Sequence, residues 1–408
     1  MQNIQLLKNT IQEYEWGSRT HIPRLMDSAA PSEKPQAELW MGAHPKAPSC
    51  VMFGDRWTGL DELIEKYPGE ILSTKTAEKF NNRLPYLFKV LAAAKPLSIQ
   101  AHPDIVQARQ GFLRENRQGI PLNAPDRNYK DDNHKPELVC ALTPFWALNG
   151  FRKRMDTISL MEQVCGTDLS REIAYLKQET DSGGLKNFFN ALMSLKINRR
   201  RTIIDKAVSR ARGLADNSDV CKWIIKLWEE YPDDIGVLSP AFLNLVCLQP
   251  GRAMFLPAGE LHAYLKGLSI ELMANSDNVL RGGLTPKHID LPELLNTLSF
   301  RERTPDILEL FSISKYEKNY IAPAEEFVLS EISLQAGQKY QSPMNRSVEI
   351  LLCLKGEAFF VEIGSQKQLT LSKGKSGLIP ASVEQYSISG DTVLYKASVP
   401  DKIKNILT

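Results

Sequence analysis

The sequence predicts a mainly β protein that carries a helical insertion. Short apolar runs, separated by Gly and Pro, predict strands between residues 84 and 142, and the same texture returns at residue 240. Between them, over residues 152–239, apolar residues recur at the spacing of amphipathic helices. From residue 327 to 399, short alternating segments with Gly and Pro turns are typical of a β-sandwich or jelly roll.

Length and composition favour a multidomain cytoplasmic protein. The chain has 408 residues, too many for one simple core, and its net charge of +2 gives no reason to expect a nucleic-acid or membrane partner. Its first residues lack the apolar core of a signal peptide, and no apolar run is long enough to span a bilayer. The six cysteines are scattered without a C-x-x-C pair, so we expect reduced, buried thiols.

The first third of the chain mixes helices and strands. Helical spacing runs from near Thr58 to just before the Asn81–Asn82 pair. The next expected elements are a buried strand over 84–91, a strand over 97–102 bounded by Pro96 and Pro103, a helix over 104–118, an ordered loop or irregular lid over 119–136, and a strand over 137–142.

The rest of the chain is predicted to be helical first and then β. Five amphipathic helix candidates fill the insertion up to about residue 232, and the basic run 198–201 within it is interpreted as a solvated helix face. A strand, a turn and a strand follow over 245–257, and a helical segment is expected over 286–310.

A short internal repeat connects the two β regions. Gly251, five residues, then Pro257-Ala is matched by Gly374, five residues, then Pro380-Ala. Five places after the proline, the first copy has His262 and the second has Gln385. Two related β-barrels, of which only the first keeps a metal ligand, would explain the match, and chance is the competing explanation.

Four residues form a candidate metal site. Gln100 and His102 are two apart, so on a strand both side chains face the same side. Glu137 opens the following strand, and His262 follows a turn that enters another. Two imidazoles, a carboxylate and an amide oxygen suit a borderline divalent metal such as zinc. A lone histidine on a strand is nevertheless more often a satisfied core or surface residue than a ligand.

Longer motifs resemble those of a broad protein superfamily and of one family within it. Gly251-x5-Pro257-x-Gly259-x2-His262 is similar to the second half of the cupin motif, with Gln100-x-His102 as a degenerate first half, although Glu137 lies farther from the first histidine than usual. Segments spread along the chain in matching order resemble the signatures of type I mannose-6-phosphate isomerases, namely residues 15–17, 37–42, 94–103, 129–137 (YKDDNHKPE) and 262–287.

The resemblance implies a fold and a domain division. The expected fold is a catalytic cupin-type jelly roll, an α-helical domain and a C-terminal jelly roll. We place the catalytic domain at 1–151 with 240–310, the helical domain at 152–239 and the C-terminal domain at 311–408.

The resemblance also implies a reaction: interconversion of mannose 6-phosphate and fructose 6-phosphate by a monomer with one zinc ion per chain. The ion would be bound by Gln100, His102, Glu137 and His262, and Arg281 would be catalytic. Residues expected to line the same pocket are Trp16, Ser98, Lys135, Tyr264, Glu271, Asp277 and Lys287.

The expected chemistry is proton transfer between C1 and C2 through a cis-enediol, with Lys135 and Glu271 as acid and base candidates. Ser98, Lys287 and Arg281 are candidates for the phosphate. Each has a structural alternative, such as a solvated loop charge for Lys135. His134 is expected to be structural or to support the ligands, and His44 to be structural. A cupin oxygenase, a sugar-binding regulator and a structural scaffold are the competing functions.

Overall fold

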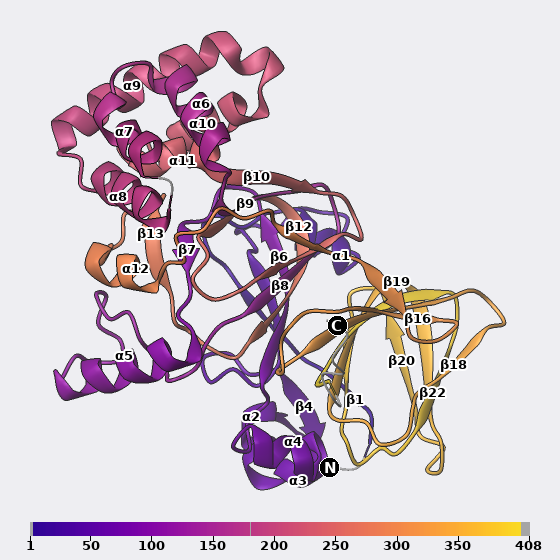
Figure 1. The fold of residues 1–408 in the computed structure, drawn as a ribbon. Helices are drawn as coiled ribbons and strands as arrows, with labels where there is room; N and C mark the ends of the chain where they lie inside the picture. Colours follow the sequence, from indigo (N-terminus) through magenta and orange to yellow (C-terminus); the bar gives the residue numbers. More distant parts are fainter. Residues whose placement is uncertain (1–2, 180, 401–408) are drawn as a thin grey trace.

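The computed structural model of the protein describes residues 3–179 and 181–400 and contains two β units and a group of helices (Figure 1). The helices of the insertion lie together at one end, the first β unit occupies the middle, and the second lies beside it. The mainly β class with a helical insertion is therefore confirmed.

The first β unit is built on one path of antiparallel strands. Their order is β14-β11-β8-β12-β6-β3-β2, and β7, β9, β10 and β13 attach to this path. The strands are β2 (Thr10–Gln12), β3 (Glu38–Met41), β6 (Tyr86–Ala93), β7 (Ile99–Ala101), β8 (Glu137–Ala141), β9 (Phe145–Phe151), β10 (Leu243–Leu248), β11 (Ala253–Leu256), β12 (His262–Ala274), β13 (Leu280–Gly283) and β14 (Asp306–Leu308).

The second β unit repeats that arrangement. Its path runs β1-β21-β19-β23-β17-β16-β15, with β18, β20 and β22 attached. The strands are β1 (Gln5–Leu6), β15 (Leu310–Ser312), β16 (Glu317–Tyr320), β17 (Val328–Leu334), β18 (Lys339–Gln341), β19 (Glu349–Glu362), β20 (Gln368–Ser372), β21 (Ser376–Ile379), β22 (Tyr386–Ser389) and β23 (Thr392–Ser398).

Strand register shows that the short sequence repeat is structural. Leu256, the residue before the first repeat proline, lies opposite Glu137. Ile379, before the second, lies opposite Glu349 in the same way. The repeat therefore marks equivalent strands of two similar β units, and Glu349 occupies the position of Glu137.

The insertion forms a helical bundle with its own apolar core. It comprises α6 (Arg154–Cys165), α7 (Ser170–Gln178), α8 (Ser182–Met193), α9 (Ile197–Leu214), η1 (Ala215–Asn217), α10 (Asp219–Glu230), η2 (Ile235–Leu238) and α11 (Ser239–Phe242). Phe188, Phe189 and Trp223 are among its buried residues, and the same core continues into Ile99 and Leu280 of the first β unit. Burial of these apolar side chains holds the bundle on the end of that unit near β7 and β13.

The remaining elements surround the first β unit. They are α1 (His21–Leu25), β4 (Cys50–Phe53), β5 (Arg56–Gly59), α2 (Leu60–Lys66), α3 (Pro68–Leu72), α4 (Thr74–Lys79), α5 (Ile105–Arg117) and α12 (Leu291–Thr297). The helix predicted over 104–118 is observed as α5. Asp104 begins it because its carboxylate accepts from the Gln107 N–H while the Gln107 side chain accepts from the Asp104 N–H.

Several predicted elements need correction. The single helix over 58–82 is three short helices: Thr58 belongs to β5, and Pro68 begins a new helix after Tyr67. In the segment 286–310 only α12 is helical, and residues 306–308 of the segment instead form strand β14, which pairs with β11. The six cysteines are free, but Cys50 and Cys247 are only half-buried.

The two β units share an apolar interface. Leu138 and Cys140 on the outer face of β8 lie in one core with Leu329 and Ile350 of the second unit. Strand β1 joins the second sheet although it lies at the start of the chain, and the domain boundaries given above remain our proposal. Among the described residues, no helix is both long enough and apolar enough to cross a membrane.

Candidate metal centre and its pocket

Three potential metal ligands converge inside the first β unit. The Nε2 atoms of His102 and His262 lie 3.3 Å from the two carboxylate oxygens of Glu137. Candidate ligand atoms of the three residues all lie within 4.8 Å of one another, and all three residues are buried. The strands explain the convergence, since Glu137 begins β8, His262 begins β12 and His102 follows β7 directly.

Backbone carbonyls fix the orientation of both imidazoles. Nδ1 of His102 lies 2.7 Å from the carbonyl oxygen of Asn278, and Nδ1 of His262 lies 3.0 Å from that of Glu260. A carbonyl can only accept, so each Nδ1 carries the proton and each Nε2 presents a lone pair to the centre. Burial lowers the pKa of His102 to about 4, which keeps this imidazole neutral.

Gln100, the fourth expected ligand, lies on the neighbouring strand β7. It lies opposite His262 in the pairing of β7 with β12, and opposite Arg281 in the pairing of β7 with β13. Its amide nitrogen donates to the Ser98 hydroxyl at 3.2 Å, so the amide oxygen is available as a ligand. Ser98, predicted to touch the substrate, is therefore placed beside a ligand.

The donor set fits a divalent cation. Burial alone would raise the pKa of Glu137, but the Lys135 ammonium holds it well below its usual range, so the carboxylate is charged. Nε2 of His102 is buried and makes no hydrogen bond. Two imidazole lone pairs aimed at a carboxylate are stable together when a cation lies between them, and nitrogen and oxygen donors of this kind suit zinc.

Lys135 and Tyr264, both predicted for the pocket, contact the same carboxylate. The Lys135 ammonium lies 3.1 Å from Glu137 Oε1, and the Tyr264 hydroxyl donates to Glu137 Oε2 at 3.4 Å. Both side chains are buried, and Trp16 packs against the small apolar cluster that contains Tyr264. The structure thus brings these predicted residues together around one ligand.

A second buried charge group lies next to the ligands. The Lys89 ammonium donates to Glu271 at 2.9 Å and lies 3.8 Å from Glu38, whose carboxylate accepts from the Trp40 indole at 2.5 Å. Burial raises the pKa of Glu271 despite the neighbouring Lys89. Burial alone would lower the pKa of Lys89, but the neighbouring carboxylates of Glu271 and Glu38 raise it. The acid or base candidate Glu271 is therefore engaged by a lysine that the sequence analysis missed.

A signal for that lysine was present in the sequence. Lys89 is the one charged residue in the apolar run over 84–91, and a charge in a fully buried strand usually has a partner or a function.

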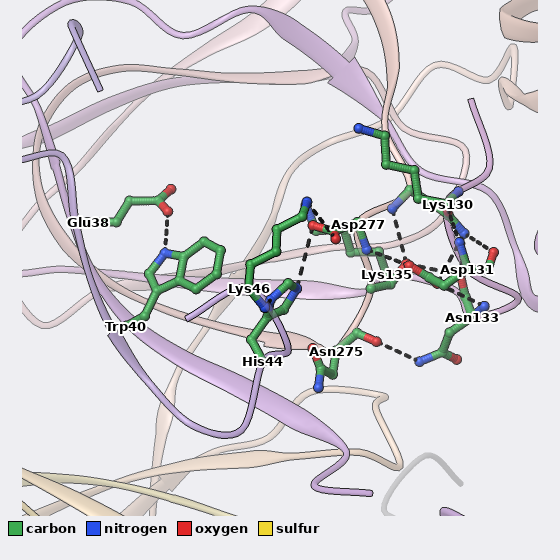
Figure 2. Close-up of polar contacts among 12 residues, drawn as sticks. Glu38, Trp40, His44, Lys46, Lys130, Asp131, Asn133, Lys135, Asn275 and Asp277 are labelled. Atoms are coloured by element: carbon green, nitrogen blue, oxygen red, sulfur yellow. Dashed lines mark hydrogen bonds and ion pairs between the residues drawn. The ribbon is translucent and has the colours of Figure 1, made fainter. Parts of the chain in front are cut away.

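Asp277, another predicted pocket residue, is held by His44 and Lys46 at the rim (Figure 2). Its carboxylate lies 2.8 Å from the Lys46 ammonium and 3.5 Å from Nε2 of His44. Burial alone would raise the pKa of Asp277, but His44 and Lys46 lower it. His44 was expected to be structural, whereas the structure places it in contact with this pocket residue.

Three cations near the rim have no carboxylate partner. Within the described residues, the side chains of Lys130, Arg281 and Lys287 make no hydrogen bond or ion pair, and they lie close enough to influence one another electrostatically. Burial lowers the pKa of all three, and the pKa of Lys130 is lowered further by Lys46, Arg281 and Lys287. Such a group favours an anionic ligand.

Comparisons with known proteins agree along the whole chain. The model of the family described as "Phosphomannose isomerase type I, catalytic domain" matches residues 4–154, and that of "Mannose-6-phosphate isomerase, cupin domain" matches residues 316–398. Mannose-6-phosphate isomerase of Escherichia coli is 41% identical over 392 residues, covering 95% of this chain and 97% of the relative. Mannose-6-phosphate isomerase 1 of Arabidopsis thaliana is 34% identical over 421 residues, covering 97% and 94%.

Solved structures extend the agreement to the fold. A crystal structure of zinc-bound mannose 6-phosphate isomerase superposes with a TM-score of 0.88 at 40% identity, covering 97% of this chain and 99% of that one. A mutant of phosphomannose isomerase from Salmonella typhimurium gives a TM-score of 0.89 at 39% identity, with the same coverage. These relatives are isomerases rather than the oxygenases or regulators considered above.

Proposed function

The chain belongs to the type I mannose-6-phosphate isomerase family, and we propose that it interconverts D-mannose 6-phosphate and D-fructose 6-phosphate with one zinc ion. The observation that carries this proposal is the convergence of His102, Glu137 and His262 beside the buried Lys135 and next to three unpaired cations. The proposed ligand atoms are the Gln100 amide oxygen, Nε2 of both histidines and the Glu137 carboxylate.

The ion supplies Lewis acidity. When bound, it would polarise the sugar carbonyl and orient the adjacent hydroxyl. The chain's own groups exclude water and set the geometry, because His102, His262, Glu137, Tyr264 and Lys135 are all less than a tenth exposed.

We assign proton transfer to Lys135 rather than to Glu271. Lys135 lies beside the ligand Glu137, whereas Glu271 is already bonded to Lys89. The Lys135 amine takes the proton from C2 of the aldose, the electron pair forms the C1–C2 double bond, and O1 gains a proton, which gives the cis-enediol. Return of a proton to C1, with loss of the proton on O2, gives the ketose. Glu271 keeps Lys89 charged and in place at the pocket wall.

The phosphate would bind at the rim. The phosphate dianion would compensate the unpaired positive charges of Lys130, Arg281 and Lys287. Among these residues, Arg281 can offer a planar pair of N–H donors. Arg281 and Lys287 are the candidates expected from the sequence, and the unpaired side chain of Lys130 supports including it with them. Asp277, whose carboxylate contacts His44 and the Lys46 ammonium, would face a sugar hydroxyl rather than the phosphate.

A coupled assay of fructose 6-phosphate formation from mannose 6-phosphate tests the proposal. Activity should disappear on chelation, return with zinc and be absent in His262→Ala. Activity that survives both treatments would contradict the metal site, and an inactive zinc-loaded protein would contradict the reaction.

Isomerisation in deuterated water tests the enediol step separately. We expect solvent deuterium in the product, because the proton passes through an exchangeable amine. Complete retention of the original hydrogen would instead indicate a hydride shift.

A further inference from the structure

The segment that carries Lys135 lies between the pocket and the second β unit. At its inner end, Lys135 contacts the ligand Glu137 through a 3.1 Å ion pair. One residue earlier, Nε2 of His134 lies 2.6 Å from Oε1 of Glu326. Glu326 belongs to the connection between β16 and β17 of the second unit. Adjacent residues of one segment therefore contact a metal ligand on one side and the second β unit on the other.

The earlier part of this segment is held by hydrogen bonds to residues of the first unit (Figure 2). The N–H groups of Lys130 and Asp131 donate to the Asn278 side chain, and Asp131 accepts from the Ser276 hydroxyl. The Asn133 amide donates to the carbonyl of Asn275. On either side of His134 the first unit holds the backbone, since the Asn133 carbonyl accepts from Ser276 and the Pro136 carbonyl from the Ala274 N–H. The His134 side chain adds a bond to the second unit between these two points.

The contact between His134 and Glu326 is suited to holding a position. The Glu326 side chain is 10% exposed and that of His134 is 28% exposed, so water competes weakly for the hydrogen bond. Burial alone would raise the pKa of Glu326, but the bond to His134 lowers it, so the acceptor is charged and the bond is a strong one. A hydrogen bond of 2.6 Å leaves little freedom to either partner.

We propose that Glu326 is a positioning residue for the reaction: through His134 it fixes the backbone that presents Lys135 to the pocket. The second β unit then contributes to turnover without touching the substrate. This inference rests on the proposed function, since it concerns the group to which we assign proton transfer. Loss of the contact lowers kcat, because a small displacement of a reacting group costs far more than the contact itself.

Kinetics of Glu326→Ala and its neighbour Glu325→Ala test the proposal in the full, zinc-loaded chain. Glu325 is a matched control, because its carboxylate is 60% exposed and pairs with Lys79 at the surface. We expect Glu326→Ala to lower kcat about tenfold with little change in KM and zinc content, and Glu325→Ala to change neither. Equal kcat values for the two variants would overturn the proposal.

A second pair of variants separates positioning from chemistry by His134 itself. The amide nitrogen of glutamine can donate from about the place of Nε2, whereas asparagine is too short to reach Glu326. We expect His134→Gln to keep most of the activity and His134→Asn to lose as much activity as Glu326→Ala. The double variant that combines His134→Asn with Glu326→Ala should lose no more than either single variant. Equal loss in both His134 variants would mean that the imidazole acts on the substrate, and the proposal would be wrong.

The outcomes also separate this inference from the proposed function. An inactive wild-type chain would contradict the function, whereas an active wild type with unchanged Glu326→Ala would contradict only the positioning role. If Glu326→Ala does not fold, the two His134 variants still test the positioning role. A general folding defect would affect both His134 variants, whereas loss of the hydrogen bond to Glu326 would affect only His134→Asn.

Discussion

The two β units have the same strand order but bury different charges at equivalent positions. In the first unit, Glu137 is faced by Nε2 of His262 at 3.3 Å. In the second, the equivalent Glu349 accepts from the Tyr386 hydroxyl at 2.8 Å and lies 3.1 Å from the ammonium of Lys396. A hydroxyl donor and a fixed ammonium thus occupy the surroundings in which the first unit presents imidazole lone pairs.

Strand register extends the comparison to the neighbouring charges. Glu271 lies opposite Val139 on β8, two residues after Glu137, and Lys396 lies opposite Leu351, two residues after Glu349. On the next strand the first unit has Lys89 opposite Glu271, whereas the second has Ser330 opposite Lys396. One strand farther, an acid occupies the same place in both units, Glu38 on β3 and Glu317 on β16. Glu317 binds the Lys396 ammonium at 2.7 Å. The second unit has therefore a lysine where the first has a glutamate.

This exchange explains why one unit can bind a metal and the other cannot. In the first unit, the carboxylates of Glu38, Glu137 and Glu271 face the ammonium groups of Lys89 and Lys135, so negative charge is in excess before any ion binds. In the second, Glu317 and Glu349 are balanced by Lys396 and by Arg346, which lies 3.4 Å from Glu349. An interior whose charges are balanced, and which presents no imidazole lone pairs to its carboxylate, attracts a divalent cation less strongly.

The largest expected effect tests this difference at one position in each unit. His262→Ala removes a metal ligand and should lower kcat by about a thousandfold, because a catalytic metal supplies several kcal/mol. Tyr386→Phe, which alters the residue in contact with the equivalent glutamate, should leave kcat unchanged. Steady-state kinetics on both variants make the comparison. A similar loss in Tyr386→Phe would show that the second unit takes part in the chemistry.

The second effect concerns stability. Lys396→Met leaves the buried Glu317 without its cation and Glu349 with Arg346 alone, and should lower the free energy of unfolding by about 3–5 kcal/mol. Lys318→Met, at an exposed position next to Glu317 on β16, is the control and should have almost no effect. Urea unfolding followed by circular dichroism measures both. If Lys396→Met were as stable as the control, the ammonium would not be the cation that balances this interior.

A smaller effect is expected at the rim of the first unit. Lys130→Ala removes one of three unpaired cations and should raise KM for mannose 6-phosphate about tenfold, since a hydrogen bond to a charged group contributes about 1.5–3 kcal/mol. The effect should shrink at high salt because Lys130 is only half-buried. Lys318→Ala provides the surface control. An unchanged KM in Lys130→Ala would remove this lysine from the phosphate site.

The smallest effect is the acid sensitivity of the second unit. Burial alone would raise the pKa of Glu317, but Lys396 holds it below its usual 4.5. Because the pKa of a carboxyl is lower in the folded state, its contribution to stability is full above about pH 4.5 and is lost as the pH falls through the folded value.

The unfolding free energy of the wild type should therefore fall more steeply below about pH 4.5 than that of Lys396→Met, in which Glu317 lacks its cation. Urea unfolding of both proteins at about pH 3.5 to 7 provides the measurement. Parallel pH profiles would contradict the assignment of Lys396 as the partner of Glu317.

Much of the β architecture could be predicted from the sequence, because strands show their periodicity locally. The strands that carry Gln100, Glu137 and His262 lie where the apolar runs placed them. The prediction of one helix over 58–82 was wrong because helical apolar spacing continues across Pro68, where one helix ends and the next begins. The prediction of a helical segment over 286–310 was wrong because β14 forms only by pairing with β11. Pairing between distant segments leaves no local periodicity.

The candidate site shows the same limit. Its ligands follow from residue type and motif, but the Lys89–Glu271 pair, the His44–Asp277 contact and the His134–Glu326 contact join residues far apart in the chain. The sequence repeat placed Gln385 at the position of His262, whereas the side chain that meets Glu349 is the adjacent Tyr386, and Gln385 binds the carbonyl of Ser342. One added residue in the second copy is enough to shift that correspondence.

Metal content per chain tests the central claim most directly. Wild type, His262→Ala and Tyr386→Phe would be dialysed against excess zinc and then against buffer, and analysed by mass spectrometry of the bound metal. We predict one zinc per chain in the wild type and in Tyr386→Phe, and none in His262→Ala. Two zinc ions in the wild type, or one retained in His262→Ala, would contradict the account of one metal-binding β unit and one neutralised by its own lysine.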